Sequence, residues 1–207
     1  MILNNTEDLF ADAEHFVRKL FYNHLPNTRF FHTIHHTAGV VEQCEALGTF
    51  YSISSSDAEK LLLAAWFHDT GYCFTSVNHE AKSSKIATEY LTSLLVPPEN
   101  ISQVVQLIQS TKMDYCPDTL LEKIIHDADT HHLASENYPI LSQLLKRELI
   151  YCDGLFLSDK EWNEQNISFF KQHHFHTQRA SELWNEKKLN RLQSLLKARD
   201  ELFSRDA

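Results

Sequence analysis

The stretch L-A-A-W-F-H-D-T-G-Y, residues 63–72, places a histidine next to an aspartate at the point where an apolar helix should end. His68 and Asp69 follow a run of leucine, alanine and aromatic residues, and Gly71 then breaks the helical pattern. Burying an imidazole beside a carboxylate is costly unless a cation neutralises them. Both groups are common ligands of divalent metals. An isolated pair is also typical of an ordinary helix end, so a metal site needs further ligands elsewhere.

A second histidine-rich stretch, F-F-H-T-I-H-H-T-A-G-V-V, covers residues 30–41. We expect it to open a helix that carries His32, His35 and His36. His32 and His36 are four residues apart and would share one helix face. The stretch is not the zincin motif H-E-x-x-H, because Thr33 stands where the general-base glutamate is required.

The stretch H-D-A-D, residues 126–129, ends another predicted helix with an apolar face. Asp127 and Asp129 are two apart and point in different directions, so one ion is not expected to bind both. His126 and Asp129 are three apart and could share a face.

The order of His36, His68-Asp69 and Asp129 on three separate helices resembles the HD-domain superfamily of metal-dependent phosphohydrolases. The resemblance covers residues 28–135 and is close around the three stretches quoted above and around N-H-E-A-K-S-S-K-I-A, residues 78–87. This last stretch is similar to a bacterial, largely uncharacterised branch of predicted HD hydrolases. The resemblance implies an all-α fold and a metal ion held by His36, His68, Asp69 and Asp129. It favours His36 because a small residue and valines follow, and Asp129 because an alanine precedes.

The resemblance also indicates how many metal ions to expect. Dinuclear HD proteins resemble one another in having extra histidines between the His-Asp pair and the last aspartate, and here only His79 and His126 lie there. One divalent ion is therefore expected, and Mn, Mg, Fe, Co, Ni and Zn all accept this ligand set.

Hydrolysis of a phosphate ester needs a metal-activated water and a base for its proton. We expect Asp69 to take part in catalysis as a ligand of the metal ion, and Glu80 is the candidate general base. Glu80 could instead only interact with the dipole at the start of its helix. The candidates for binding the charged phosphoryl group are His32, His79, Thr111 and Lys112. Lys85 and Arg29 are further candidates of lower rank.

Composition places these residues in one α-helical domain. The chain has 207 residues, four glycines and five prolines, and long stretches keep a helical apolar period. We expect about eight to nine helices in one HD-type domain over residues 1–207, with a metal-binding core at 28–135 and C-terminal helices at 136–207 packed on it. His173, His174 and His176 are expected in a turn between helices that lines the mouth of the site. Trp162, Trp184 and Phe169 are candidates for either the core or a homodimer face.

The net charge and the cysteines indicate which binding partners and which cellular compartment to expect. A net charge of −9 argues against a nucleic-acid partner or an anionic membrane surface. Four scattered cysteines without a C-x-x-C pair indicate reduced thiols, and neither a signal peptide nor a long apolar run is visible. We therefore expect a cytoplasmic protein.

The expected function is hydrolysis of a small phosphorylated metabolite, with a nucleotide as the expected substrate. Two alternatives stay open. One is a dinuclear phosphodiesterase or oxygenase that uses His79 as an extra ligand. The other is a non-catalytic module that binds a nucleotide in the same pocket and signals through a partner.

Overall fold

The computed structural model describes residues 6–205, with side chains placed for residues 9–201. Within residues 6–205 it contains nine α-helices, two short 3-10 helices and no strand, which confirms the all-α prediction. The elements are α1 Thr6–His24, α2 Ile34–Phe50, α3 Ser55–Phe67, η1 Thr70–Cys73, α4 His79–Ser93, α5 Pro98–Gln109, α6 Leu120–Asp129, η2 Thr130–Ala134, α7 Tyr138–Asp153, α8 Asp159–Gln172 and α9 Gln178–Arg205.

Helix α3 is the centre of the first part of the chain. It contacts α1, α2, α4, α5 and α6, and its side chains from Leu63 to Phe67 are all buried. A helix that is apolar on every side must be covered on every side, and these neighbours cover it. The predicted His-Asp pair therefore leaves α3 from inside the core.

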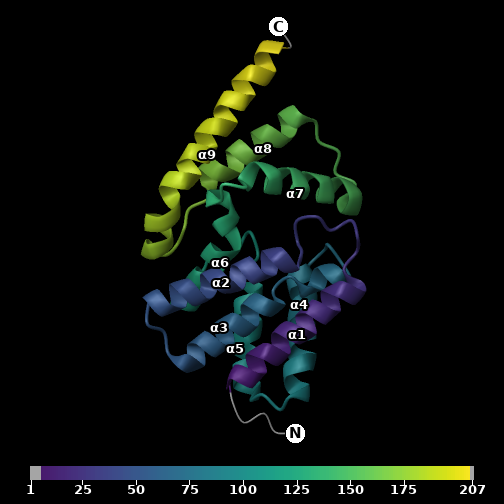
Figure 1. Cartoon of the computed structure of the whole chain (residues 1–207), viewed down its shortest axis with the longest axis vertical. Coiled ribbons are helices and arrows are strands. Elements are labelled where there is room, and N and C mark those ends of the chain that lie inside the picture. The colour runs from purple at the N-terminus through teal and green to yellow at the C-terminus, as the bar shows by residue number, and fades with distance from the viewer. Residues whose placement is uncertain (1–5, 206–207) are drawn as a thin grey trace.

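The C-terminal helices α7, α8 and α9 gather at the opposite end of the molecule from α1 and α5, with α6 and η2 between the two groups (Figure 1). Phe175, Ala180 and Trp184 belong to the main core, while Leu133, Tyr138 and Phe170 form a second, smaller cluster. Trp162 and Trp184 are buried, so these two candidates for a dimer face belong to the interior. A homodimer, like the single-domain organisation, stays a prediction.

Local capping explains where two of the ligand-bearing helices begin. The N-cap of α3 is Ser54, whose hydroxyl accepts a hydrogen bond from the Asp57 amide at 3.1 Å. Helix α6 starts with a complete capping box formed by Thr119 and Glu122.

Two findings bear on the cellular setting. No helix within residues 6–205 is long and apolar enough to cross a membrane. The four cysteines are free thiols.

Candidate metal centre

His68 is oriented by its own helix. It is fully buried at the end of α3, and its Nδ1 lies 2.8 Å from the carbonyl oxygen of Ala65. Because a carbonyl only accepts, Nδ1 carries the proton and Nε2 is left free as a ligand atom. A backbone carbonyl in this role is the usual device that fixes a metal-binding imidazole.

Asp69 completes the pair. Its Oδ2 lies 3.3 Å from His68 Nε2, yet neither atom makes a hydrogen bond within the described residues, and both are sealed from solvent. Buried polar atoms without partners are rare because each one costs free energy. A cation bound between the imidazole and the carboxylate would remove this cost, so the residues fit a metal ion.

The other two predicted ligands reach the same place from α2 and α6. His36 Nε2 lies 3.4 Å from Asp69 Oδ2 and 3.0 Å from Asp129 Oδ1. Asp129 Oδ1 is also 3.6 Å from His68 Nε2. The ligand atoms of His36, His68 and Asp69 all lie within 4.8 Å of one another, which is compatible with one shared ion. The structure thus brings all four predicted ligands together.

The electrostatics of the cluster favour a cation. Burial alone would raise the pKa of Asp69, but the charges and hydrogen bonds of the neighbouring histidines, led by the charge of His68, together outweigh it and hold that pKa well below its usual value. Burial likewise opposes ionisation of Asp129, but the hydrogen bonds and charges of His36 and His68 together lower its pKa. Burial lowers the pKa of His68, while the charges and hydrogen bonds of Asp69 and Asp129 together raise it by more. Both aspartates are therefore carboxylates at neutral pH.

Gly71 allows the next segment to approach the cluster. A Cβ atom at this position would overlap the carbonyl oxygen of His79, the first residue of α4. The Gly71 amide also donates a hydrogen bond of 2.8 Å to Ser83 Oγ. This close approach places His79 Nε2 3.5 Å from Asp69 Oδ1.

Glu80, the candidate base, lies beside His79 rather than on the four ligands. Its Oε1 is 3.7 Å from His79 Nε2, and its side chain is mostly buried. Glu80 therefore connects to Asp69 through the His79 imidazole. Its role as a base stays a prediction.

His32 lies near the four clustered residues, but not in the way that the sequence predicted. It does not share a helix face with His36, because α2 begins at Ile34 and Thr33 is its N-cap in extended conformation. Instead, the His32 ring stacks on Tyr72 with centroids 4.2 Å apart, and Tyr72 stacks on His79 at 3.8 Å. The three rings form a wall beside Asp69.

Glu148 of α7 holds this wall in place, and the sequence reasoning missed it. Its carboxylate accepts hydrogen bonds from His32 Nδ1 at 2.5 Å, from Arg29 at 2.9 Å and from the Phe31 and His32 amides. Burial lowers the pKa of His32, but the hydrogen bond to Glu148 and the charges of Asp69, Glu148 and Asp129 together raise it by more, so the net shift favours the cation. The only available signal was an acid that follows two basic residues in the stretch L-L-K-R-E-L-I, residues 144–150.

Residues 33–134 match the family model of the HD domain. The matched segment runs from the N-cap of α2 to the end of η2 and includes all four clustered ligands.

These residues form an HD domain.

The resemblance seen in the sequence is confirmed at the level of the superfamily. HD domains are typically metal-dependent hydrolases and bind divalent metals. No curated protein and no solved structure in the comparisons matches the chain. Membership of the bacterial branch stays a prediction.

Several predicted phosphate-binding residues lie apart from the HD ligands. The Thr111 hydroxyl donates a hydrogen bond to the Ile108 carbonyl, and within the described residues neither Thr111 nor Lys112 contacts the four ligands. Lys85 is exposed and lies 3.8 Å from Glu89. Arg29 is buried, but its charge is already paired with Glu148. Arg29, Thr111 and Lys112 lie outside the helices, where the sequence does not determine the direction of a side chain, whereas Lys85 lies inside α4.

The first aspartate of the H-D-A-D stretch has a structural role. Asp127 accepts hydrogen bonds from the His176 amide at 2.7 Å and the Thr177 amide at 2.8 Å, and so fixes the turn that precedes α9. Of the histidine turn, His173 contacts Thr130 through Nε2 at 3.0 Å. His173, His174 and His176 do not line the pocket at the ligands, so their predicted place at its mouth is wrong.

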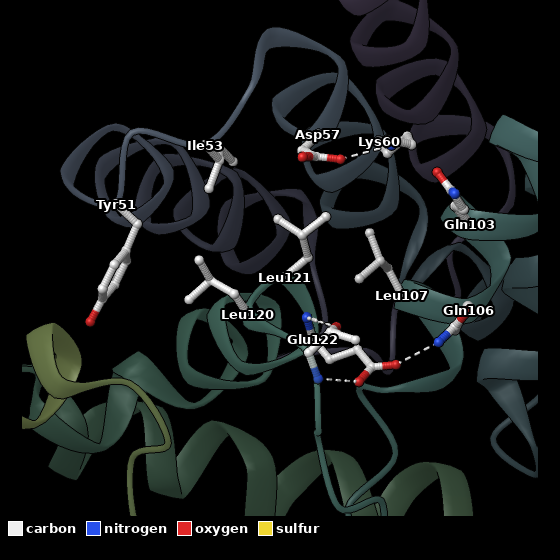
Figure 2. A pocket seen from close by; sticks show the side chains of 11 residues that line it. Tyr51, Ile53, Asp57, Lys60, Gln103, Gln106, Leu107, Leu120, Leu121 and Glu122 are labelled. Carbon is white, nitrogen blue, oxygen red and sulfur yellow. Dashed lines mark hydrogen bonds and ion pairs between the residues drawn. The ribbon is translucent and has the colours of Figure 1, made fainter.

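Two cavities of similar size differ in the residues that line them. The one in Figure 2, about 400 Å³, lies between α3, α5 and α6. Its charged groups already have partners, because Lys60 lies 2.8 Å from Asp57 and Glu122 accepts a hydrogen bond of 2.8 Å from the Gln106 amide. It contains none of the HD ligands. The other, about 380 Å³, is lined by Asp129 and His32 and opens from the metal centre toward α7 and α8.

Proposed function

We propose that this protein is a metal-dependent phosphohydrolase that cleaves a phosphate ester of a small metabolite. The observation that carries the proposal is the convergence of two histidines and two aspartates in which His68 Nε2 and Asp69 Oδ2 are buried without hydrogen-bond partners. His36, His68, Asp69 and Asp129 would hold the ion. A divalent ion held there supplies a bound water of lowered pKa and polarises a phosphoryl oxygen.

The chain's own groups provide the remaining parts of the reaction. The oxygen of water forms a bond to phosphorus, the ester P–O bond breaks, and the alcohol leaves with a proton. Glu80, through His79, is the proposed acceptor of the water proton. His32 faces the same space with a raised pKa and is the proposed partner of the phosphoryl charge.

Phosphate release tests this proposal. We expect the chain reconstituted with Mn to hydrolyse at least one phosphomonoester and the Asp69→Asn variant to lose that activity. We expect Glu80→Gln to lower kcat by about a hundredfold with metal content unchanged, as removal of a general base does. Full activity in a metal-free Asp69→Asn protein would refute the proposal. The nucleotide expected from the sequence is one of the esters to compare in this assay.

A dinuclear centre is the second candidate, because His79 Nε2 lies 3.5 Å from Asp69 Oδ1 and could add a ligand. It predicts about two metal ions per chain and the loss of one of them in His79→Ala. The mononuclear proposal predicts the same metal content in wild type and in His79→Ala.

Binding of a nucleotide without turnover under any metal would instead support the signalling module.

A further inference from the structure

The cavity that opens from the metal centre has walls from outside the HD match. Its volume is about 380 Å³, within the range of small-molecule sites. Asp129 and His32 form its inner end, so a substrate whose phosphoryl group sits at the ligands must extend into it. Its apolar lining consists of Phe31, Met113, Leu145, Leu149, Trp162 and Phe169.

Most polar groups in this lining are already hydrogen-bonded inside the protein. The Trp162 indole donates to Ser142 Oγ at 3.0 Å, and Thr130 Oγ1 donates to the His126 carbonyl at 3.0 Å. Asn166 donates to the Trp162 carbonyl and accepts from Tyr138. The other two polar residues of the lining are His132, whose Nδ1 lies 3.1 Å from the Asp129 carbonyl oxygen, and the exposed Gln165.

The same lining contains no lysine or arginine. Cations on α7 are engaged elsewhere, since Lys146 lies 2.7 Å from Asp159 and the Arg147 guanidinium lies over the Phe30 ring at 4.2 Å. A second phosphate or a carboxylate in the cavity would lose water without gaining a counter-ion, which is costly. Sugar hydroxyls would meet few free donors or acceptors.

We propose that this cavity binds the alcohol part of the phosphate ester, and that this part is an uncharged, apolar aromatic or branched alkyl group. The proposal rests on the phosphohydrolase function and narrows its substrate class. The phosphoryl group lies at Asp129 and His32, and the apolar group packs between α7 and α8 against Trp162 and Phe169. Nucleoside monophosphates are expected to bind less well, because a base and ribose carry more polar groups than the cavity can satisfy.

A comparison of two primary alkyl phosphates shows the effect of binding in the cavity apart from the effect of the leaving group. 2-Phenylethyl phosphate and ethyl phosphate release alcohols of similar basicity, so a difference in kcat/KM reports the cavity. We expect the Mn-loaded chain to prefer 2-phenylethyl phosphate by at least about tenfold, mainly through KM, and to prefer it over adenosine 5′-monophosphate. Equal kcat/KM for the two alkyl esters, or a preference for the nucleotide, would overturn the proposal while leaving the hydrolase function intact.

A variant and a binding measurement complete the test. Leu145→Gln places an amide in the lining at similar volume, and the matched control is Leu189→Gln on the exposed face of α9. We expect the preference ratio to fall at least about fivefold in the first and to stay within about twofold in the second. With the non-hydrolysable 2-phenylethylphosphonate, wild type should bind at least about tenfold more tightly than it binds ethylphosphonate. Equal affinities would refute the apolar site, whereas no turnover of any ester would refute only the hydrolase function.

Discussion

At the residue scale, one buried carboxylate joins the C-terminal helices to the wall formed by His32, Tyr72 and His79. Glu148 is 1 % exposed and accepts hydrogen bonds from Arg29, from two backbone amides and from His32. It therefore fixes the loop before α2 and orients the His32 ring against Tyr72. Arg29 adds to this arrangement, because its guanidinium lies 4.4 Å from the Tyr72 ring centroid.

Removing Glu148 should destabilise the fold. In Glu148→Ala the buried Arg29 loses its counter-charge, and breaking a buried ion pair from one side costs about 3–5 kcal/mol. We expect a loss of that order in the free energy of unfolding, measured by urea denaturation. The control Glu136→Ala removes an exposed glutamate near the start of α7 and should change stability by less than about 0.5 kcal/mol. Similar values for the two variants would contradict the role given to Glu148.

Gly71 gives a second prediction at this scale. Gly71→Ala forces η1 away from the first residue of α4, because the new methyl group would overlap the His79 carbonyl. Overpacking of this kind costs about 1–3 kcal/mol, and it should move His79 away from Asp69. Thermal unfolding measures the loss. The control Gly39→Ala meets no atom nearer than 3.4 Å and should be close to wild type. An unchanged melting temperature in Gly71→Ala would contradict the close approach.

At the element scale, α6 is fixed at both ends. Its last residue is the ligand Asp129, and at its start Glu122 accepts hydrogen bonds from Thr119, Asp118, Gln106 and Tyr115. Figure 2 shows Glu122 beneath Leu107 and Leu121, on the side of α6 that faces α5. The network at the start of α6 therefore positions a helix that carries a ligand at its other end.

This network predicts a pH dependence. Burial raises the pKa of Glu122, but the hydrogen bonds led by Thr119 outweigh it and lower the pKa from 4.5 to about 2. A carboxylate with a lowered folded-state pKa stabilises the protein above pH 4.5, and this contribution disappears as the pH falls toward 2. Glu122→Gln should therefore lose less stability than wild type when urea unfolding at about pH 7 is compared with about pH 3. An equal loss in both proteins would contradict this assignment.

The elements themselves were largely predictable from sequence, whereas their caps and the direction of loop side chains were not. The apolar period predicted α3 and α6, and the family resemblance predicted the four residues that lie together in the candidate metal centre. His32 was misplaced because the helix begins only at Ile34, a boundary set by Thr33 in extended conformation. Glu148 could not be found, because its partners lie more than a hundred residues earlier in the chain. Long-range polar contacts leave no periodic signal in a single sequence.

At the scale of the whole molecule, Asp127 ties α9 to the HD domain. Its two oxygens accept the amides of His176 and Thr177, which otherwise would lack partners at the start of α9. Neighbouring aspartates of α6 therefore have separate roles, with Asp127 holding the C-terminal helices and Asp129 holding the proposed ion. The lining of the proposed substrate cavity would depend on the first role, and the proposed reaction on the second.

Paired variants should separate these roles. Asp127→Ala leaves two amides without a buried acceptor, which costs about 1–3 kcal/mol each. We expect faster hydrogen exchange at the start of α9 with metal content retained. Asp129→Ala should show the reverse, with metal affinity reduced and exchange in α9 unchanged. Loss of metal in Asp127→Ala without loss of α9 protection would contradict the division.

Metal content per chain tests the central claim most directly. We would measure it by elemental mass spectrometry on wild type, on Asp69→Ala and on the control Asp114→Ala, which removes an exposed aspartate outside the cluster. The account predicts about one divalent ion per chain in wild type and in the control, and almost none in Asp69→Ala. A wild-type protein that binds no metal after reconstitution with Mn, or an Asp69→Ala variant that keeps its ion, would contradict it.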